Sequence, residues 1–287
     1  MNKIKLWSML FALVMVATTA QAVVRPLSYI DLDTGYRWDK VYHRFVVWND
    51  GLNSAANPVR VNDLNSFQLG AKVQSAICSG NWFVRGSGHY GWVYPGDFQE
   101  GGLYARVKGH TVDASASTGY YFSFHPCWGL GPVIGYAYDQ MHLHTSHLFQ
   151  NTSGGDVDNG GMKLTQTFQG PFVGLDLLFQ PSCLWQVELE WNLIHGWWEF
   201  RDSYDVLTRA SKRTHHNVWG NVFQVDTTYI LSRCWSIGLE LSYETRVGQG
   251  NQGHYKRTIV PLAFANQKIQ SLSWQSFSTM FHVGYNF

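Results

Sequence analysis

Apolar and polar positions alternate along several long segments of the chain, and the C-terminal segment shows this most clearly. One set of alternate positions is mostly large and apolar: Phe277, Thr279, Phe281, Val283, Tyr285 and Phe287. The positions between them carry small or polar residues: Ser276, Ser278, His282, Gly284 and Asn286. A strand that separates lipid from a polar lumen needs this period of two. The pattern therefore predicts a transmembrane β-strand whose lipid face ends on the terminal phenylalanine.

The same alternation recurs upstream, and turn and loop composition divides the chain into segments. The division predicts ten strands, at 29–46, 61–77, 82–94, 111–124, 130–148, 162–180, 184–203, 217–231, 236–248 and 268–287. Four short connections lie at 78–81, 125–128, 180–183 and 232–235, and five long polar ones near 49–60, 95–110, 149–161, 204–216 and 249–267. Outer-membrane barrels have an even strand number and alternate short periplasmic turns with longer extracellular loops. The sequence therefore predicts an all-β fold, a transmembrane antiparallel β-barrel of about ten strands in the bacterial outer membrane.

The N-terminal residues predict export. Lys3 and Lys5 precede an apolar run over residues 6–17, and Ala20-Gln21-Ala22 supplies a small-x-small cleavage site. A run of about a dozen apolar residues is short for a membrane-spanning helix, which needs roughly 20. We expect residues 1–22 to be a signal peptide and residues 23–287 to form one outer-membrane barrel domain.

Composition agrees with a membrane barrel and argues against some partners. Aromatic residues make up 16% of the chain, as aromatic girdles would require. Charged residues make up 14%, against roughly 25% in ordinary soluble domains. The net charge of +1 gives no indication of a nucleic-acid partner. We therefore expect outer-membrane lipid as a partner and no nucleic acid.

Ten strands enclose a narrow lumen, because barrel diameter grows with strand number. Acidic and basic residues on the inner face could line a small pore, or could close it by pairing with one another. Buried charges are costly without partners, so we expect a mostly filled lumen. The predicted lumen-facing residues are Arg85, Asp176, Glu188, Glu190, Asp226, Glu240, Glu244 and Arg246.

All four cysteines fall in the short turns, one in each: Cys78, Cys127, Cys183 and Cys234. The periplasm permits disulfides. Neighbouring turns of a barrel lie roughly 10 Å apart, whereas a disulfide needs Cα atoms within about 7 Å. Bonds to other envelope proteins therefore fit at least as easily as bonds within the chain. The four cysteines are far apart in the sequence, whereas the ligands of a zinc site come in closely spaced pairs.

The histidines are the residues to consider as ligands of a metal or cofactor. His142 and His144 share one strand face, and such a pair can bind a metal. Imidazoles near an exposed barrel rim are more often solvated, so we expect no metal and no cofactor.

Two resemblances extend this interpretation, and the first concerns the omptin proteases. The ten-strand layout, the segment 167–175 and the segment 190–204 are similar to omptin strands. Omptins activate a water between an Asp-x-Asp pair and an Asp-x-His pair. At the corresponding places this chain has Asp97 within 95–100 and Asp202 within 201–205, with no histidine. Because an imidazole that exchanges protons near neutral pH is missing, we expect no enzymatic activity; Asp97 and Asp202 would carry the alternative, a surface protease.

The chain also resembles the Protochlamydia outer membrane protein family of chlamydia-related bacteria. The resemblance lies in size, signal peptide, single barrel, terminal aromatic residue and turn cysteines. It implies a porin-like or structural surface protein, in an envelope stiffened by disulfides between proteins. The C-terminal pair Tyr285 and Phe287 resembles the recognition signal of the barrel assembly machinery, which makes that machinery an expected partner. An adhesin that binds through its long loops is a further alternative.

Overall fold

A computed structural model describes residues 28–49, 52–54, 58–77, 81–100, 102–125, 127–152, 155–158, 160–182, 184–204, 209–249, 253–258 and 266–287. The predicted signal peptide, 1–22, lies outside these ranges, as do Cys78 and Cys183. No helix in the described ranges has the length and apolarity needed to cross a membrane.

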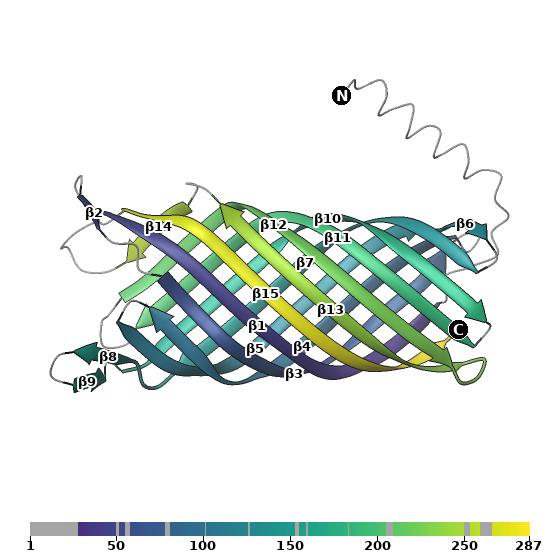
Figure 1. Ribbon diagram of the computed structural model, residues 1–287, viewed down its shortest axis with the longest axis horizontal. Helices are drawn as coiled ribbons and strands as arrows, with labels where there is room; N and C mark the ends of the chain where they lie inside the picture. Colours follow the sequence, from purple (N-terminus) through teal and green to yellow (C-terminus); the bar gives the residue numbers. More distant parts are fainter. Residues whose placement is uncertain are drawn as a thin grey trace, which may run out of the picture.

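Ten long antiparallel strands form a closed barrel in the described part of the chain (Figure 1). They are β1 (Tyr29–Asn49), β3 (Pro58–Ile77), β4 (Trp82–Glu100), β5 (Leu103–Tyr120), β7 (Trp128–Thr145), β10 (Met162–Ser182), β11 (Trp185–Tyr204), β12 (Arg209–Ile230), β13 (Trp235–Gln249) and β15 (Asn266–Asn286). Each pairs with its neighbours in sequence, and β15 pairs with β1 to close the sheet. The predicted ten-stranded barrel is confirmed.

Five short strands extend the barrel at its ends. They are β2 (Leu52–Ser54), β6 (Phe122–His125), β8 (Phe149–Thr152), β9 (Gly155–Asp158) and β14 (Gly253–Thr258). β14 pairs with β12, and β8 pairs with β5 and β9. Figure 1 shows β2, β8, β9 and β14 at one end of the barrel, with the C-terminus at the other. We call the end with the C-terminus the short-turn end and the opposite one the long-loop end.

Two of the predicted long loops are wrong in extent. β4 and β5 stay paired from Gly96↔Val107 to Glu100↔Leu103, so most of 95–110 is strand. β12 begins at residue 209, inside the predicted loop 204–216. Outward positions here include Asp97 and Arg106, which are exposed and polar. The composition resembles a loop because these strands continue past the apolar zone, where their outer face no longer needs apolar residues.

A bulge interrupts the alternation of β4. The register of the β4–β5 ladder shifts between Val93 and Gly96, at Tyr94 and Pro95. Proline cannot donate to the ladder, so a bulge is one of the places where a strand accommodates it. An extra residue moves all later side chains to the opposite face. Trp92 therefore faces outward and so does Asp97, although the two are five positions apart and an uninterrupted strand would place them on opposite faces.

Away from the bulges, the predicted alternation is confirmed. In β15, Phe277, Phe281 and Tyr285 are exposed on the outer face, whereas Ser276 and His282 are buried inside. Cross-strand aromatic pairs surround the outer wall at the short-turn end, with ring centroids 5.1 to 5.7 Å apart: Trp82–Tyr120, Trp185–Tyr229 and Trp235–Tyr285. Trp and Tyr concentrate where a membrane meets water. These pairs indicate the level of one interface.

Candidate functional site

The lumen contains the barrel's buried charges, and the structure places all eight predicted lumen-facing residues there. Arg85 of β4 is at the centre of a first cluster. Its guanidinium Nη2 lies 3.2 Å from Asp176 Oδ2 and also contacts Glu188, and its Nη1 donates to Glu190 Oε2 at 2.6 Å. Its Nε donates to Gln74 at 2.9 Å. One guanidinium thus pairs with three carboxylates from the facing strands β10 and β11.

Arg246 of β13 is at the centre of a second cluster, together with Arg37 of β1. Arg246 contacts Asp139 and Glu244. Its guanidinium lies 4.1 Å from the Phe168 ring centroid, a cation–π distance. The polar network therefore makes direct contact with apolar side chains at its long-loop side.

Arg37 connects this cluster to further carboxylates. Its Nε lies 3.0 Å from Asp39, and its Nη1 lies 3.2 Å from Asp113 Oδ2 and 3.8 Å from Asp139 Oδ1. Asp139 therefore lies between Arg37 and Arg246. The contacts join strands from opposite sides of the barrel.

Lys72 and two histidines complete the polar network. Lys72 Nζ lies 3.5 Å from Asp226 and also pairs with Glu240. The ring of His89 lies between two carboxylates, 2.7 Å from Asp113 and 3.1 Å from Asp33. His282 lies between two others, 3.4 Å from Asp31 and 3.2 Å from Asp226.

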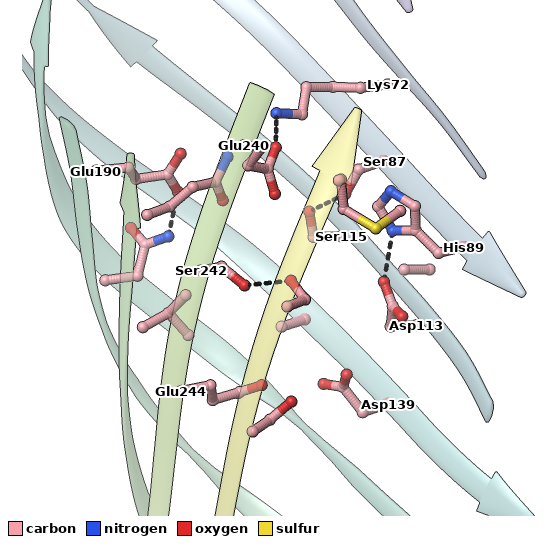
Figure 2. Close-up of a pocket in the computed structure, with 18 of the residues that line it drawn as sticks. Lys72, Ser87, His89, Asp113, Ser115, Asp139, Glu190, Glu240, Ser242 and Glu244 are labelled. Atoms are coloured by element: carbon pink, nitrogen blue, oxygen red, sulfur yellow. Dashed lines mark hydrogen bonds and ion pairs between the residues drawn. The ribbon is translucent and has the colours of Figure 1, made fainter. Parts of the chain in front are cut away.

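A small cavity lies within this network. Figure 2 shows it with Lys72, Glu240 and His89 at its edge. It has a volume of about 140 Å³ and is lined mostly by charged, amide and hydroxyl side chains, with a few apolar ones such as Phe172 and Met280. Ser87 bonds to Ser115, and Ser242 to Ser278, across this region. A polar cavity of this kind fits ordered water or a small ion.

Toward the long-loop end the lumen contains many buried apolar side chains, a feature that the alternation does not predict, and the polar side chains of His43, Gln166 and His215 are buried among them. We use the name apolar layer for thirteen of the inward apolar side chains in this half, each 2% exposed or less: Val41, Leu64, Phe98, Val107, Met141, Leu143, Leu164, Phe168, Trp198, Phe200, Val218, Leu272 and Trp274. They form part of one hydrophobic cluster. They come from nine of the ten long strands of the described chain, so the layer crosses the whole lumen.

Several members of the lumen network were missed in the sequence. Lys72, Asp139 and Arg37 lie on strands whose inner face mixes polar with apolar or glycine positions, so their alternation is weaker. The signal that could have found them is charge itself. An Arg, Lys or Asp inside a ten-residue strand predicts an inward position, because a charge on the lipid face is costly.

The two aspartates of the protease alternative face opposite sides of the wall. Asp202 is buried and points inward from β11. The Asp97 side chain is 66% exposed on the outer surface, 3.8 Å from Arg106, because the bulge in β4 turns it outward. The structure does not bring these two carboxylates together around one substrate position.

The remaining predicted residues lie at the short-turn end. Cys127 and Cys234 are partly exposed free thiols, whereas Cys78 and Cys183 lie outside the described residues. Tyr285 and Phe287 both face outward, and the Phe287 amide donates to the Ser28 carbonyl at 3.0 Å.

The outer-face histidines make local contacts at the long-loop end. His142 Nδ1 lies 2.9 Å from the Thr165 hydroxyl. His147 Nδ1 lies 2.7 Å from Asp158 Oδ2 in the β8–β9 hairpin. The hydrogen bonds that Asp158 accepts, first from His147 and then from the Gly160 amide, lower the pKa of its carboxyl below the usual range.

A closed barrel with an aromatic-banded apolar outer wall and a charged interior defines the chain as a multi-pass outer-membrane β-barrel protein. The sequence model of the family "Protochlamydia outer membrane protein" (Pom) matches residues 31–287. The chain belongs to this family.

Comparison with solved structures concerns the fold. The outer membrane protease OmpT from Escherichia coli is similar, with a TM-score of 0.72, 11% identity, and coverage of 93% of this chain and 99% of that one. The transport unit of the autotransporter AIDA-I from E. coli gives a TM-score of 0.44, 11% identity, and coverage of 96% and 97%. Among curated proteins, none matches this sequence. At such identity the likeness to OmpT concerns the fold alone.

Proposed function

We propose that this protein is a closed, non-conducting barrel with a structural role in the cell envelope. The observation that carries the proposal is the apolar layer. A side chain that lines an open channel keeps one face accessible to water, whereas Phe168, Trp198 and Trp274 are 0 to 2% exposed. Entry of water and ions into an apolar constriction is also unfavourable in free energy.

The ion pairs in the lumen, on the short-turn side of the apolar layer, support the same conclusion. Porin lumens are polar and water-filled, so their charges stay hydrated. Here Arg85, Arg246 and Lys72 are each bonded to two or more carboxylates and are 8% exposed or less. These contacts connect facing strands across the lumen, which supports a structural role.

Planar-bilayer conductance of the refolded, heat-modifiable barrel tests the proposal. We expect no channel steps from the wild type. We expect steps from the double variant Trp198→Ala/Trp274→Ala, because two large side chains of the apolar layer are removed. The matched control is Trp197→Ala/Trp219→Ala, since both indoles face outward. Discrete, reproducible steps from the folded wild-type barrel would refute a closed lumen.

We also propose that the turn cysteines connect this barrel to other envelope proteins. Cys127 and Cys234 are partly exposed free thiols at the short-turn end, and an oxidising periplasm favours disulfides there. Non-reducing electrophoresis of isolated envelopes should give high-mass bands that collapse to the monomer with reductant. A variant with all four cysteines changed to serine should lack these bands. A monomer band that reductant leaves unchanged would contradict cross-linking.

Absence of proteolysis is part of the same proposal. The outward position of Asp97 supports it, because Asp202 points into the lumen and the two carboxylates lie on opposite faces of the wall. We expect no cleavage of a dibasic peptide by the folded barrel. Cleavage that disappears in both Asp97→Ala and Asp202→Ala would overturn this expectation.

A further inference from the structure

Three buried side chains meet where the first and last strands of the barrel close. Asp31 and Asp33 lie two residues apart on the inner face of β1, and His282 lies opposite Asp33 on β15. One ligand atom from each lies within 4.8 Å of the other two. All three residues are 6% exposed or less. We propose that Asp31, Asp33 and His282 bind a divalent transition-metal ion, with Zn²⁺ as the probe.

The imidazole of His282 gives an independent indication of a ligand. It is 2% exposed, and its two ring nitrogens face the carboxylates of Asp31 and Asp226 without hydrogen-bond geometry to either. His282 Nδ1 lies 3.4 Å from Asp31 Oδ2. Two ligand atoms at about 2.0–2.1 Å from one tetrahedral metal are about 3.4 Å apart. The spacing is long for a hydrogen bond and suits two ligands of a shared ion.

The surroundings supply the outer contacts that metal ligands require. A metal-binding histidine usually directs its other ring nitrogen to a carboxylate, and ligand carboxylates are themselves hydrogen-bonded. His282 Nε2 lies 3.2 Å from Asp226 Oδ1. His89 Nε2 lies 3.1 Å from Asp33 Oδ2 and orients that carboxylate. Asp226 and His89 are therefore positioning residues.

Two glycines make room for this arrangement. A Cβ atom at Gly238 would lie 2.1 Å from His282 Nε2, and one at Gly284 would lie 2.2 Å from Asp31 Oδ1. A second, small cavity of about 10 Å³ borders Asp31 and Asp226. It lies among residues of the short-turn end.

The charge of the lumen also favours a cation. Its ion-pair network contains four Arg and Lys side chains: Arg37, Lys72, Arg85 and Arg246. It contains eleven carboxylates: Asp31, Asp33, Asp39, Asp113, Asp139, Asp176, Glu188, Glu190, Asp226, Glu240 and Glu244. Carboxylates are in excess by five even when both network histidines are protonated. Buried charge needs compensation, which either protonation of carboxyl groups or a bound cation supplies.

A metal at this site would hold β1 and β15 together, where the first and last strands close the barrel. Asp33 and His282 are about 250 residues apart in sequence, so a metal that binds both closes a very long loop of the chain. Metal binding and barrel folding are then coupled.

Equilibrium dialysis of the untagged, refolded barrel against Zn²⁺ tests the site, with metal content and urea midpoint as readouts. We expect one tightly bound ion, and a midpoint that rises with Zn²⁺. His282→Gln and, separately, Asp31→Asn should weaken binding at least tenfold and remove the Zn²⁺ dependence of the midpoint. The matched control, His142→Gln/His144→Gln, changes outward imidazoles and should bind Zn²⁺ as the wild type does.

Heat-modifiable migration on gels shows that each variant is folded, and Asp31→Asn serves if His282→Gln does not fold. Wild-type barrel refolded with Zn²⁺ that retains none would overturn the proposal. So would equal binding by the folded Asp31→Asn or His282→Gln protein, or loss of binding in the outward control alone.

Discussion

Replacing Arg85 by methionine would remove a guanidinium that contacts Asp176, Glu188 and Glu190 inside the barrel. Methionine keeps most of the side-chain volume, so the change mainly removes charge and hydrogen bonds. Asp176 is fully buried and the other two carboxylates are nearly so. Breaking a buried pair by removing one partner costs about 3–5 kcal/mol, because an uncompensated charge is left behind. We expect Arg85→Met to lower the free energy of unfolding by about that amount.

Arg106→Met is the matched control. Arg106 is 79% exposed and lies 3.8 Å from Asp97 on the outer surface. An exposed pair of this kind contributes about 0–1 kcal/mol. Urea unfolding in lipid vesicles, followed by tryptophan fluorescence, measures both variants.

A second substitution isolates the charge effect. In the Arg85→Met background, Asp176→Asn removes one of the uncompensated charges, so it should restore part of the lost stability. If Arg85→Met and Arg106→Met lie within about 1 kcal/mol of each other, the assumption that the lumen is a low-dielectric interior is wrong.

Three further outcomes follow from local contacts. His147→Ala should raise the pKa of Asp158 toward its ordinary value in an NMR titration. Because the pKa of Asp158 is lowered in the folded protein, its contact with His147 stabilises the hairpin at pH values above the ordinary carboxyl pKa. This stabilisation is lost as the pH falls through the lowered pKa. Gly170→Ala should cost about 1–3 kcal/mol in urea, because its Cβ would lie 2.5 Å from Gly196 Cα, whereas Gly102→Ala, with nothing within 4 Å, should be neutral. Phe287→Ala should reduce the amount of heat-modifiable barrel in envelopes, while the outward Phe281→Ala should not; equal amounts would contradict an assembly role for the terminal residue.

The sequence alone predicted the strands where the alternation is uninterrupted. In β15 and β13 the period of two assigns each residue to lipid or lumen, which is why Glu240, Glu244 and Arg246 were predicted correctly as inward. Short turns with a cysteine located the strand ends on one side. The pattern failed at the bulge in β4, because one extra residue reverses the two faces and composition does not reveal the insertion. The protease alternative at Asp97 depended on that segment.

Tertiary structure decided what the inward residues do. Arg85 and its carboxylates are 91 to 105 residues apart in sequence, so no local pattern could pair them. The apolar layer was unexpected because each strand contributes only one or two residues to it, at positions where alternation predicts merely an inward side chain.

Asp31, Asp33 and His282 belong to the two ends of the chain and meet only when β15 pairs with β1. Sequence thus determined which face of the wall each residue occupies, since a strand's period is local. Closure of the barrel determined the partners, because the distance across a narrow lumen depends on all ten strands together.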